Sequence, residues 1–164
     1  MDVSAPERLR AAGLRLTKPR LAVLSVLATA PHAETATVIA LVRRDLPNVS
    51  HQAIYDCLAA LTDAGITRRI QPAGSLARYE LRVGDNHHHV VCRSCGAVAD
   101  VDCPVGHAPC LTPGSSPATD GFLLEEAEVI FWGTCAACRE HGPTDAPDGK
   151  PVAGSSSTQR KDSA

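Results

Sequence analysis

The residues with the clearest chemical potential lie in one stretch, Tyr79–Cys95, which reads YELRVGDNHHHVVCRSC. It supplies a carboxylate, three consecutive imidazoles and two thiols: Glu80, His87, His88, His89, Cys92 and Cys95. Side chains of a strand alternate between its faces, so His87 and His89 would share one face, roughly 6–7 Å apart. Two imidazoles at that spacing can bind one metal ion, whereas Cys92 would point the other way and serve a different ion. The alternative is a polar, solubilising strand beside a turn.

Two C-x-x-C pairs indicate a second kind of site. Each pair can hold one edge of a tetrahedral ion, and four thiolates close a structural Zn²⁺ site without an open position for catalysis. The pairs are Cys92 with Cys95 and Cys135 with Cys138. A redox dithiol is the alternative. Between the pairs, Cys103, His107 and Cys110 are open to three interpretations: incidental residues, a reactive thiol pair, or an accessory metal site.

Composition favours a cytoplasmic protein. The first ten residues lack the apolar core of a signal peptide, and no apolar run is long enough for a membrane span. Seven cysteines in a reducing compartment indicate metal ligands or reactive thiols. Residues 1–80 hold 10 Lys/Arg and 7 Asp/Glu, whereas residues 81–164 hold 6 and 11. A basic front half and an acidic rear half suit a nucleic-acid reader joined to a metal-binding part.

The front half predicts a winged helix-turn-helix domain. Apolar spacing and cap residues indicate four helices, the last of which follows Ser50 and ends at Gly65. Two alternating segments joined by a Pro-Ala-Gly-Ser turn predict a hairpin. The expected helices are Ala5–Ala12, Lys18–Ala30, Thr35–Arg44 and the segment from His51, and the expected strands are Ile66–Pro72 and Ser75–Leu81.

In this arrangement the helix from His51 enters the major groove of double-stranded DNA. Its apolar stripe, Ile54, Cys57, Leu58 and Leu61, would face the core, which makes Cys57 a core thiol. The candidate DNA-binding residues are Arg15, Lys18, Arg20, Ser50, His51, Gln52 and Tyr55, and the hairpin adds Arg68, Arg69 and Arg78. The alternative is a helical protein-interaction domain with ordinary surface charge.

The rear half predicts a small sheet that needs support. Gly96–Asp102 and Phe122–Thr134 would join the histidine strand, and a sheet of this size is marginal without zinc and self-association. Phe131 and Trp132 would lie in the core or a dimer interface. Cys103–Asp120 is rich in Pro, Gly and Ser and predicts a loop. The predicted units are a DNA-binding domain (1–80), a hinge (81–86), a metal-binding dimerisation domain (87–140) and a disordered tail (141–164).

Together these segments resemble the ferric uptake regulator (Fur) family over about residues 7–139. The resemblance rests on RLTKPRLAVL, PNVSHQAIYDCLAALTDAGI, HHHVVCRSCG and the second C-x-x-C pair. Further segments, such as CPVGHAPCLTP and GFLLEEAEVIFWGTC, are similar to the branch linked to catalase-peroxidase genes. The resemblance implies an α+β fold, with a winged helix-turn-helix domain followed by a small α/β dimerisation domain that holds a four-cysteine zinc site.

The resemblance also implies three ligand sets. The structural zinc ligands would be Cys92, Cys95, Cys135 and Cys138. The regulatory ligands would be His32, Glu80, His87, His89 and Asp100, which suit Fe²⁺ or Mn²⁺ and also accept Zn²⁺. The accessory ligands would be His88, His107 and Glu126. Glu126, or alternatively Glu125, would stand in for a family histidine whose position is Ala127 here.

The implied function is that of a metal-dependent DNA-binding repressor of iron and/or oxidative-stress genes. Its partners would be a DNA operator and a second copy of the chain, with no membrane, small-molecule substrate or enzyme activity. Glu80 fits the iron-sensing pattern of the family, and Asp100 fits the peroxide-sensing pattern. Alternatives are a zinc-uptake regulator, a non-heme metalloenzyme and a zinc-storage protein that does not bind DNA.

Overall fold

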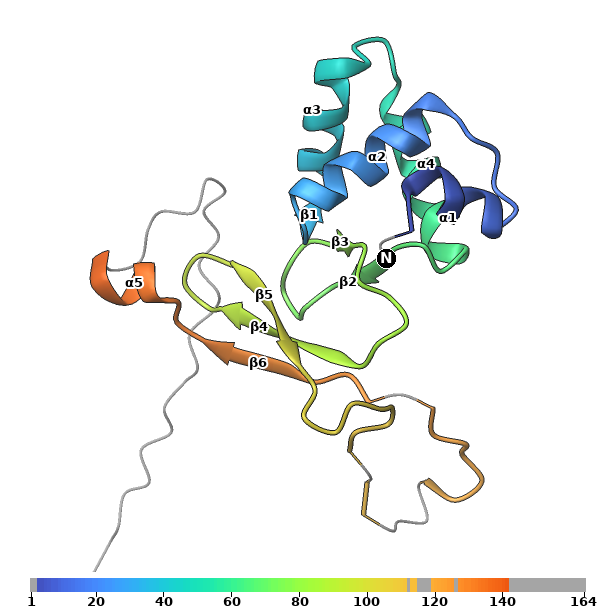
Figure 1. Cartoon of the computed structure of the whole chain (residues 1–164). Helices are drawn as coiled ribbons and strands as arrows, with labels where there is room; N and C mark the ends of the chain where they lie inside the picture. The colour runs from blue at the N-terminus through green and yellow to red at the C-terminus, as the bar shows by residue number, and fades with distance from the viewer. Residues whose placement is uncertain (1–2, 112, 115–118, 126, 142–164) are drawn as a thin grey trace, which may run out of the picture.

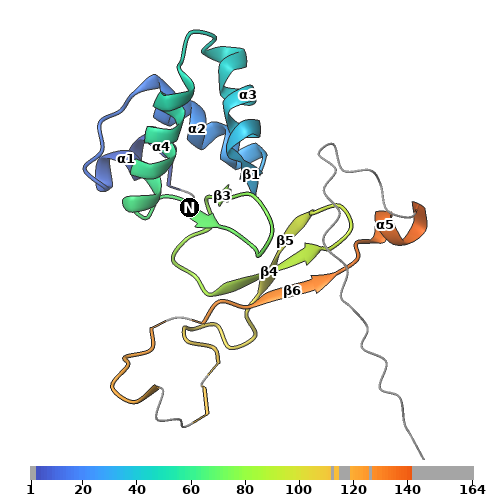
Figure 2. The ribbon, with the colours of Figure 1, turned by 180° about the vertical axis from the view of Figure 1, so that it is seen from behind.

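The computed structural model describes residues 3–111, 113–114, 119–125 and 127–141. The described part of the chain has four N-terminal helices and two three-stranded sheets. The helices stand above the second sheet, and the short strands of the first sheet lie between the helices and the second sheet (Figures 1 and 2). We call residues 3–80 the head and residues 87–141 the base. Within these described residues, no helix is long and apolar enough to cross a membrane. The tail was predicted over residues 141–164; His141 is described as the last residue of a helix, and residues 142–164, like Glu126, lie outside the described residues.

The head contains the four predicted helices: α1 (Ala5–Ala11), α2 (Lys18–Thr29), α3 (Thr35–Asp45) and α4 (His51–Asp63). Each boundary lies within two residues of the expectation, since apolar spacing and caps are local signals. Ser50 caps α4 by accepting a hydrogen bond from the backbone N–H of Ala53 at 3.1 Å. The predicted stripe of α4 is buried, and Cys57 is part of the head core, as expected.

The head sheet has the strand order β1-β3-β2 and lies on the side of the helices that faces the base (Figure 1). Its strands are β1 (Ala33–Glu34), β2 (Arg68–Ile70) and β3 (Arg78–Glu80). The hairpin β2–β3 was predicted, but β1 was not, because two residues carry no periodicity. β1 pairs with β3 so that Ala33 lies opposite Tyr79, and this pairing carries the preceding His32 close to Glu80.

Arg78, a candidate DNA-binding residue of the hairpin, forms contacts within the head sheet. Its guanidinium forms an ion pair with Glu34 at 2.6 Å and donates to the backbone oxygen of His32 at 3.1 Å. The side chain is 19% exposed and links β3 to β1. In this structure Arg78 therefore stabilises the β1–β3 pairing, and its contact with DNA stays a prediction.

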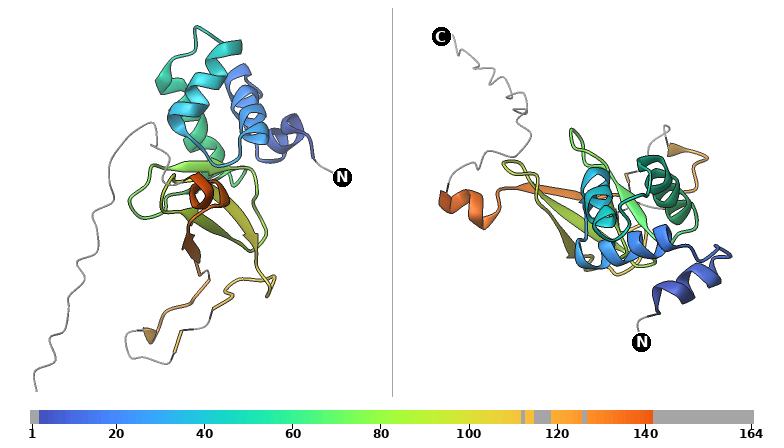
Figure 3. Two further views of the ribbon diagram at one scale, coloured as in Figure 1. Left: turned by 90° about the vertical axis from the view of Figure 1, so that its left-hand side faces the viewer. Right: turned by 90° about the horizontal axis from the view of Figure 1, so that it is seen from above.

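The base is a sheet of order β5-β4-β6, followed by a short helix. Its elements are β4 (His87–Cys92), β5 (Val98–Asp102), β6 (Ile130–Gly133) and α5 (Ala136–His141). The central strand, β4, is antiparallel to β5 and parallel to β6. Viewed end-on or from above, the base extends from beneath the head and ends at α5 (Figure 3).

Two expectations for the base need correction. The strand predicted over Phe122–Thr134 is confined to Ile130–Gly133, because β6 pairs only with the four-residue segment His89–Cys92 of β4. Phe122 and Leu123 are 71% and 85% exposed and pair with no strand among the described residues. Helix α5 was missed, since its six residues are too few for a helical apolar pattern.

The segment between head and base is held by charge. Arg82 forms ion pairs of 2.6 Å with Asp85 and with Asp102 on β5, and its guanidinium lies 3.8 Å from Asp100. On the head side, Arg8 donates to the backbone oxygen of Leu81 at 3.5 Å. These contacts are mostly solvent-exposed, and such ion pairs are each worth about 1 kcal/mol or less. They orient the connection without locking it.

Candidate metal centres

Four side chains from head and base meet at one point, and we call them the bridging cluster: His32, Glu80, His89 and Asp100. One donor atom from each lies within 4.8 Å of all the others. His32 Nε2 lies 3.0 Å from Glu80 Oε2 and 2.8 Å from Asp100 Oδ1. His89 Nε2 lies 3.2 Å from the same Glu80 oxygen and 3.6 Å from Asp100 Oδ1. The donor atoms therefore converge as ligands of one ion do.

The backbone explains how these residues converge. His32 follows α2 and has a φ of 60°, in the left-handed region. That conformation costs a non-glycine residue on the order of 1–3 kcal/mol and is typical of functional sites. Glu80 ends β3 and is 1% exposed. His89 and Asp100 are direct partners in the β4–β5 register, so their side chains leave the sheet on the same face.

His87, the fifth predicted regulatory ligand, lies beside the bridging cluster. Its Nε2 is 3.2 Å from Glu80 Oε1, and its Nδ1 is 2.9 Å from Asp85 Oδ1. It is not one of the four residues whose donor atoms lie within 4.8 Å of one another. In this structure His87 contacts Glu80 through the other carboxylate oxygen, and Asp85 orients its ring.

Glu80 is the electrostatic centre of the site. Burial opposes its charged form, but hydrogen bonds from His32 and His89, with the charges of His89 and His87, lower its pKa to about 2. Burial also disfavours the charged form of His32, yet the Glu80 hydrogen bond and the Asp100 charge raise the pKa of His32. An ionised carboxylate among imidazoles, without a thiolate, suits Fe²⁺, Mn²⁺ or Zn²⁺.

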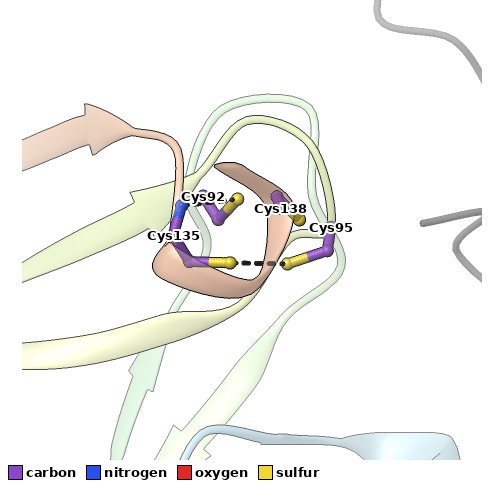
Figure 4. A group of neighbouring side chains, drawn as sticks. All are labelled: Cys92, Cys95, Cys135 and Cys138. Atoms are coloured by element: carbon purple, nitrogen blue, oxygen red, sulfur yellow. Dashed lines mark hydrogen bonds between the residues drawn. The ribbon is translucent and has the colours of Figure 1, made fainter. Parts of the chain in front are cut away.

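Four cysteines form a second group at the far end of the base: Cys92, Cys95, Cys135 and Cys138. Figure 4 shows their sulfur atoms turned towards one another, with Cys138 on α5. The Sγ atoms of Cys95 and Cys135 are 3.7 Å apart, and the backbone N–H of Cys135 donates to Cys92 Sγ at 3.3 Å. No disulfide joins these cysteines.

The parallel pairing of β4 and β6 explains this convergence. Cys92 lies opposite Gly133, so the two strands end side by side and their C-x-x-C pairs follow together. The N–H of Cys135, with other backbone donors, lowers the pKa of Cys92 to about 6. Backbone bonding favours the charged form of Cys95, but burial and the three neighbouring thiols raise its pKa to about 12. Four sulfurs this close ionise together only around a cation, and four thiolates are a closed zinc set.

A third group joins His88 to two cysteines that the sequence left unassigned, Cys103 and Cys110. Their donor atoms also lie within 4.8 Å of one another. Of the predicted accessory ligands, His88 is present, and His107 belongs to no such group among the described residues. His107 instead contributes a backbone oxygen, which accepts a hydrogen bond from Asn86 at 2.8 Å. Alternation along β4 placed His88 opposite His87 and His89, but the two thiols depend on a loop path that periodicity cannot give.

The predicted DNA-binding residues lie on exposed parts of the head. Tyr55 is 51% exposed on α4, and the Gln52 amide donates to the Asp56 carboxylate at 2.8 Å. His51 Nε2 lies 3.0 Å from Arg43 Nη1, which adds a cation beside α4. Arg20 donates to the backbone oxygen of Arg15 at 2.9 Å, so these two residues and Lys18 form the α1–α2 corner. Ser50 serves as the α4 cap.

Comparisons with known proteins agree with this arrangement. The profile of the ferric uptake regulator family matches residues 11–107. The transcriptional regulator FurA of Mycobacterium tuberculosis is 62% identical over 132 residues, which cover 80% of this chain and 88% of that protein. The peroxide-responsive repressor PerR of Staphylococcus aureus is 32% identical over 133 residues, with 80% and 87% covered.

A solved structure extends the likeness to three dimensions. The ferric uptake regulator of Vibrio cholerae superposes with a TM-score of 0.59 at 25% identity, over 80% of this chain and 100% of that one. The α+β fold with a winged helix-turn-helix head was therefore predicted correctly. The matched profile, the identity to FurA and the shared fold lead to one conclusion: this chain belongs to the ferric uptake regulator family.

Proposed function

We propose that the chain is a metal-dependent, DNA-binding transcriptional repressor that acts as a homodimer in the cytoplasm. The observation that carries this proposal is the bridging cluster, in which His32 and Glu80 belong to the head and His89 and Asp100 to the base. An ion held by both parts fixes the head relative to the base. The two heads of a dimer then present their α4 helices at a set half-site spacing.

The two ions have different tasks in this proposal. Zn²⁺ in the four-cysteine group stabilises the base, and Fe²⁺ or Mn²⁺ in the bridging cluster, with His87 as a further ligand, sets the head. Residues 81–86 act as the hinge between domains 1–80 and 87–140. Among the described residues, the links between head and base that need no ion are the ion pairs of Arg82, the bond from Arg8 and the direct contacts within the cluster. The latter are those of His32 with Asp100 and of Glu80 with His87 and His89. In this proposal the ion adds to these contacts and fixes the orientation of the head. Metal thus shifts a conformational population and does no chemistry on DNA.

The signal is iron, oxidative stress or both. Support comes from the names of two relatives, a regulator called FurA and a repressor described as peroxide-responsive. The bridging cluster offers two imidazoles and two carboxylates, a donor set that suits Fe²⁺. We propose genes of iron homeostasis and peroxide defence as targets.

The proposal is tested with DNA from upstream of the protein's own coding region. We expect binding only when Fe²⁺ or Mn²⁺ is added, and we expect the His87→Ala variant to lose about 10–100-fold in metal-dependent DNA affinity, the usual effect of removing one supporting ligand. Fluorescence anisotropy across a metal titration measures both. Zinc content reports whether the base stays intact. Unchanged metal dependence in His87→Ala would remove this residue from the switch.

The reading surface on α4 has its own test. Replacing Gln52 and Tyr55 by alanine removes two exposed side chains from the expected groove-facing side of α4. Each base contact is worth about 1–3 kcal/mol, so we expect roughly 10-fold weaker operator binding per residue with unchanged metal affinity. Ser25→Ala, on the exposed side of α2, is the matched control. Equal operator affinities for the double variant and the control would place the reading surface elsewhere.

A further inference from the structure

A cluster of soft donors lies on the opposite face of β4 from the bridging cluster. His88 is 5% exposed, and its Nε2 lies 3.3 Å from the Sγ of Cys110. Cys103 Sγ completes the group, with all three donor atoms within 4.8 Å of one another. None of these residues belongs to the bridging cluster or to the four-cysteine group.

The chain builds this cluster from a strand and a returning loop. β5 ends at Asp102, which is the register partner of His87, so Cys103 follows directly beside the start of β4. The Asn86 amide then holds the loop: its Nδ2 contacts Cys103 Sγ at 3.2 Å and the His107 backbone oxygen at 2.8 Å. The loop therefore folds back far enough to bring Cys110 against His88.

The surroundings resemble the outer sphere of a metal site. Backbone N–H groups of Val105 and Gly106 and the Asn86 amide all donate to the Cys103 sulfur. Such donors orient a ligating sulfur and balance its charge. On the other side, the ring of Phe131 packs edge-on against His88, with 6.3 Å between ring centroids, and limits the rotation of the imidazole.

We propose that His88, Cys103 and Cys110 form a third metal site, selective for a thiophilic ion such as Zn²⁺. Two thiolates and one imidazole are a soft set without a carboxylate, which disfavours Fe²⁺ and Mn²⁺ relative to Zn²⁺. Three protein ligands leave one tetrahedral position for water. The ion joins the loop 103–110 to β4, on the face of the base opposite to the bridging cluster.

This site differs from the accessory site that family resemblance implied. That set had imidazole and carboxylate ligands, His88, His107 and Glu126. Here two sulfur atoms stand with His88, and the side chain of His107 is not among the donors. Because the donor atoms differ, the expected ion differs as well. Retention of Zn²⁺ in preference to Mn²⁺ therefore distinguishes the sulfur-containing site from the accessory site that the resemblance implied.

The first test uses the wild-type chain and needs no variant. Mn²⁺ is kept in excess to occupy the bridging cluster, zinc is added stepwise, and alkylation of each cysteine by N-ethylmaleimide is followed by mass spectrometry. Because a metal-bound thiolate is a poor nucleophile, we expect zinc to slow alkylation of Cys103 and Cys110 about tenfold or more. Protection should come after that of the four-cysteine group. Identical alkylation rates for Cys103 and Cys110 with and without zinc would overturn the proposal.

The second test counts ions. The double variant Cys103→Ser, Cys110→Ser should bind one zinc equivalent fewer than the wild type, and its Co²⁺ form should lose part of the sulfur-to-cobalt charge-transfer absorption. Cys57→Ala, a thiol of the head core, is the control and should keep the wild-type stoichiometry. His88→Ala, which leaves all thiols in place, should lose the same equivalent. Equal zinc content in the wild type, the double variant and His88→Ala would show that no third site exists.

Discussion

Replacing Glu80 by glutamine is expected to abolish metal-dependent DNA binding, with a loss of at least about 100-fold in operator affinity at saturating Mn²⁺. Glu80 accepts from three imidazoles: its Oε2 contacts His32 and His89, and its Oε1 contacts His87. A carboxamide has the same shape but offers one acceptor oxygen and no charge. The substitution therefore removes both the shared anionic ligand and the bonds that orient the rings.

The measurement pairs a Mn²⁺ titration by calorimetry with DNA binding by anisotropy. Glu128→Gln is the matched control, because it makes the same change at an exposed carboxylate of the base outside all three donor groups. Zinc content should be the same in both variants, since the four-cysteine group is at the other end of β4. If Glu80→Gln kept the wild-type metal dependence, the bridging cluster would not be the switch.

Replacing Cys92 by serine should have the largest effect on stability. The base is a sheet of three short strands, which is marginal on its own, and structural zinc supplies on the order of 10 kcal/mol of folding free energy in small domains. Without one thiolate the ion is lost and the ends of β4 and β6 separate from α5. We expect the base to unfold and the chain to stop dimerising, while the helical head, with its own core, stays folded.

Circular dichroism, metal analysis and sedimentation check this expectation together. The helical signal should persist, bound zinc should fall, and the sedimentation coefficient should become that of a monomer. Cys103→Ser makes the same chemical change outside the four-cysteine group. It should lose at most the ion proposed at His88, Cys103 and Cys110, and should remain a dimer with its structural zinc. A dimeric, cooperatively folded Cys92→Ser protein would show that the base does not depend on this ion.

Local signals made the head predictable. The apolar stripe of α4 and its Ser50 cap lie within a few turns of chain, so the sequence alone gives the helix and its buried face. β1 could not be predicted because it forms only by pairing with a strand that is distant in the sequence: Ala33 pairs with Tyr79. The position of His32 in the site follows from that pairing, and here only the family resemblance indicated it.

In the base, the sequence predicted the cysteine pairs but neither the length of β6 nor the path of the loop that carries Cys103 and Cys110. The two C-x-x-C pairs were recognisable because their spacing is itself chemical information. The strand predicted from Phe122 was too long, since apolar composition cannot tell whether a partner strand exists. The association of Cys103 and Cys110 with His88 depends on how a Pro- and Gly-rich loop returns, which no periodic pattern encodes.

β4 carries donors of all three groups within six residues, with His87 and His89 on one face and His88 and Cys92 on the other. A strand with this arrangement is intolerant of insertions and deletions. A shift of the strand by one residue would exchange its two faces. His88 would then occupy the face where His87 and His89 are needed, and Cys92 would point away from Cys95, Cys135 and Cys138. Natural variation in chain length should therefore accumulate in the turns on either side of this strand and not within it.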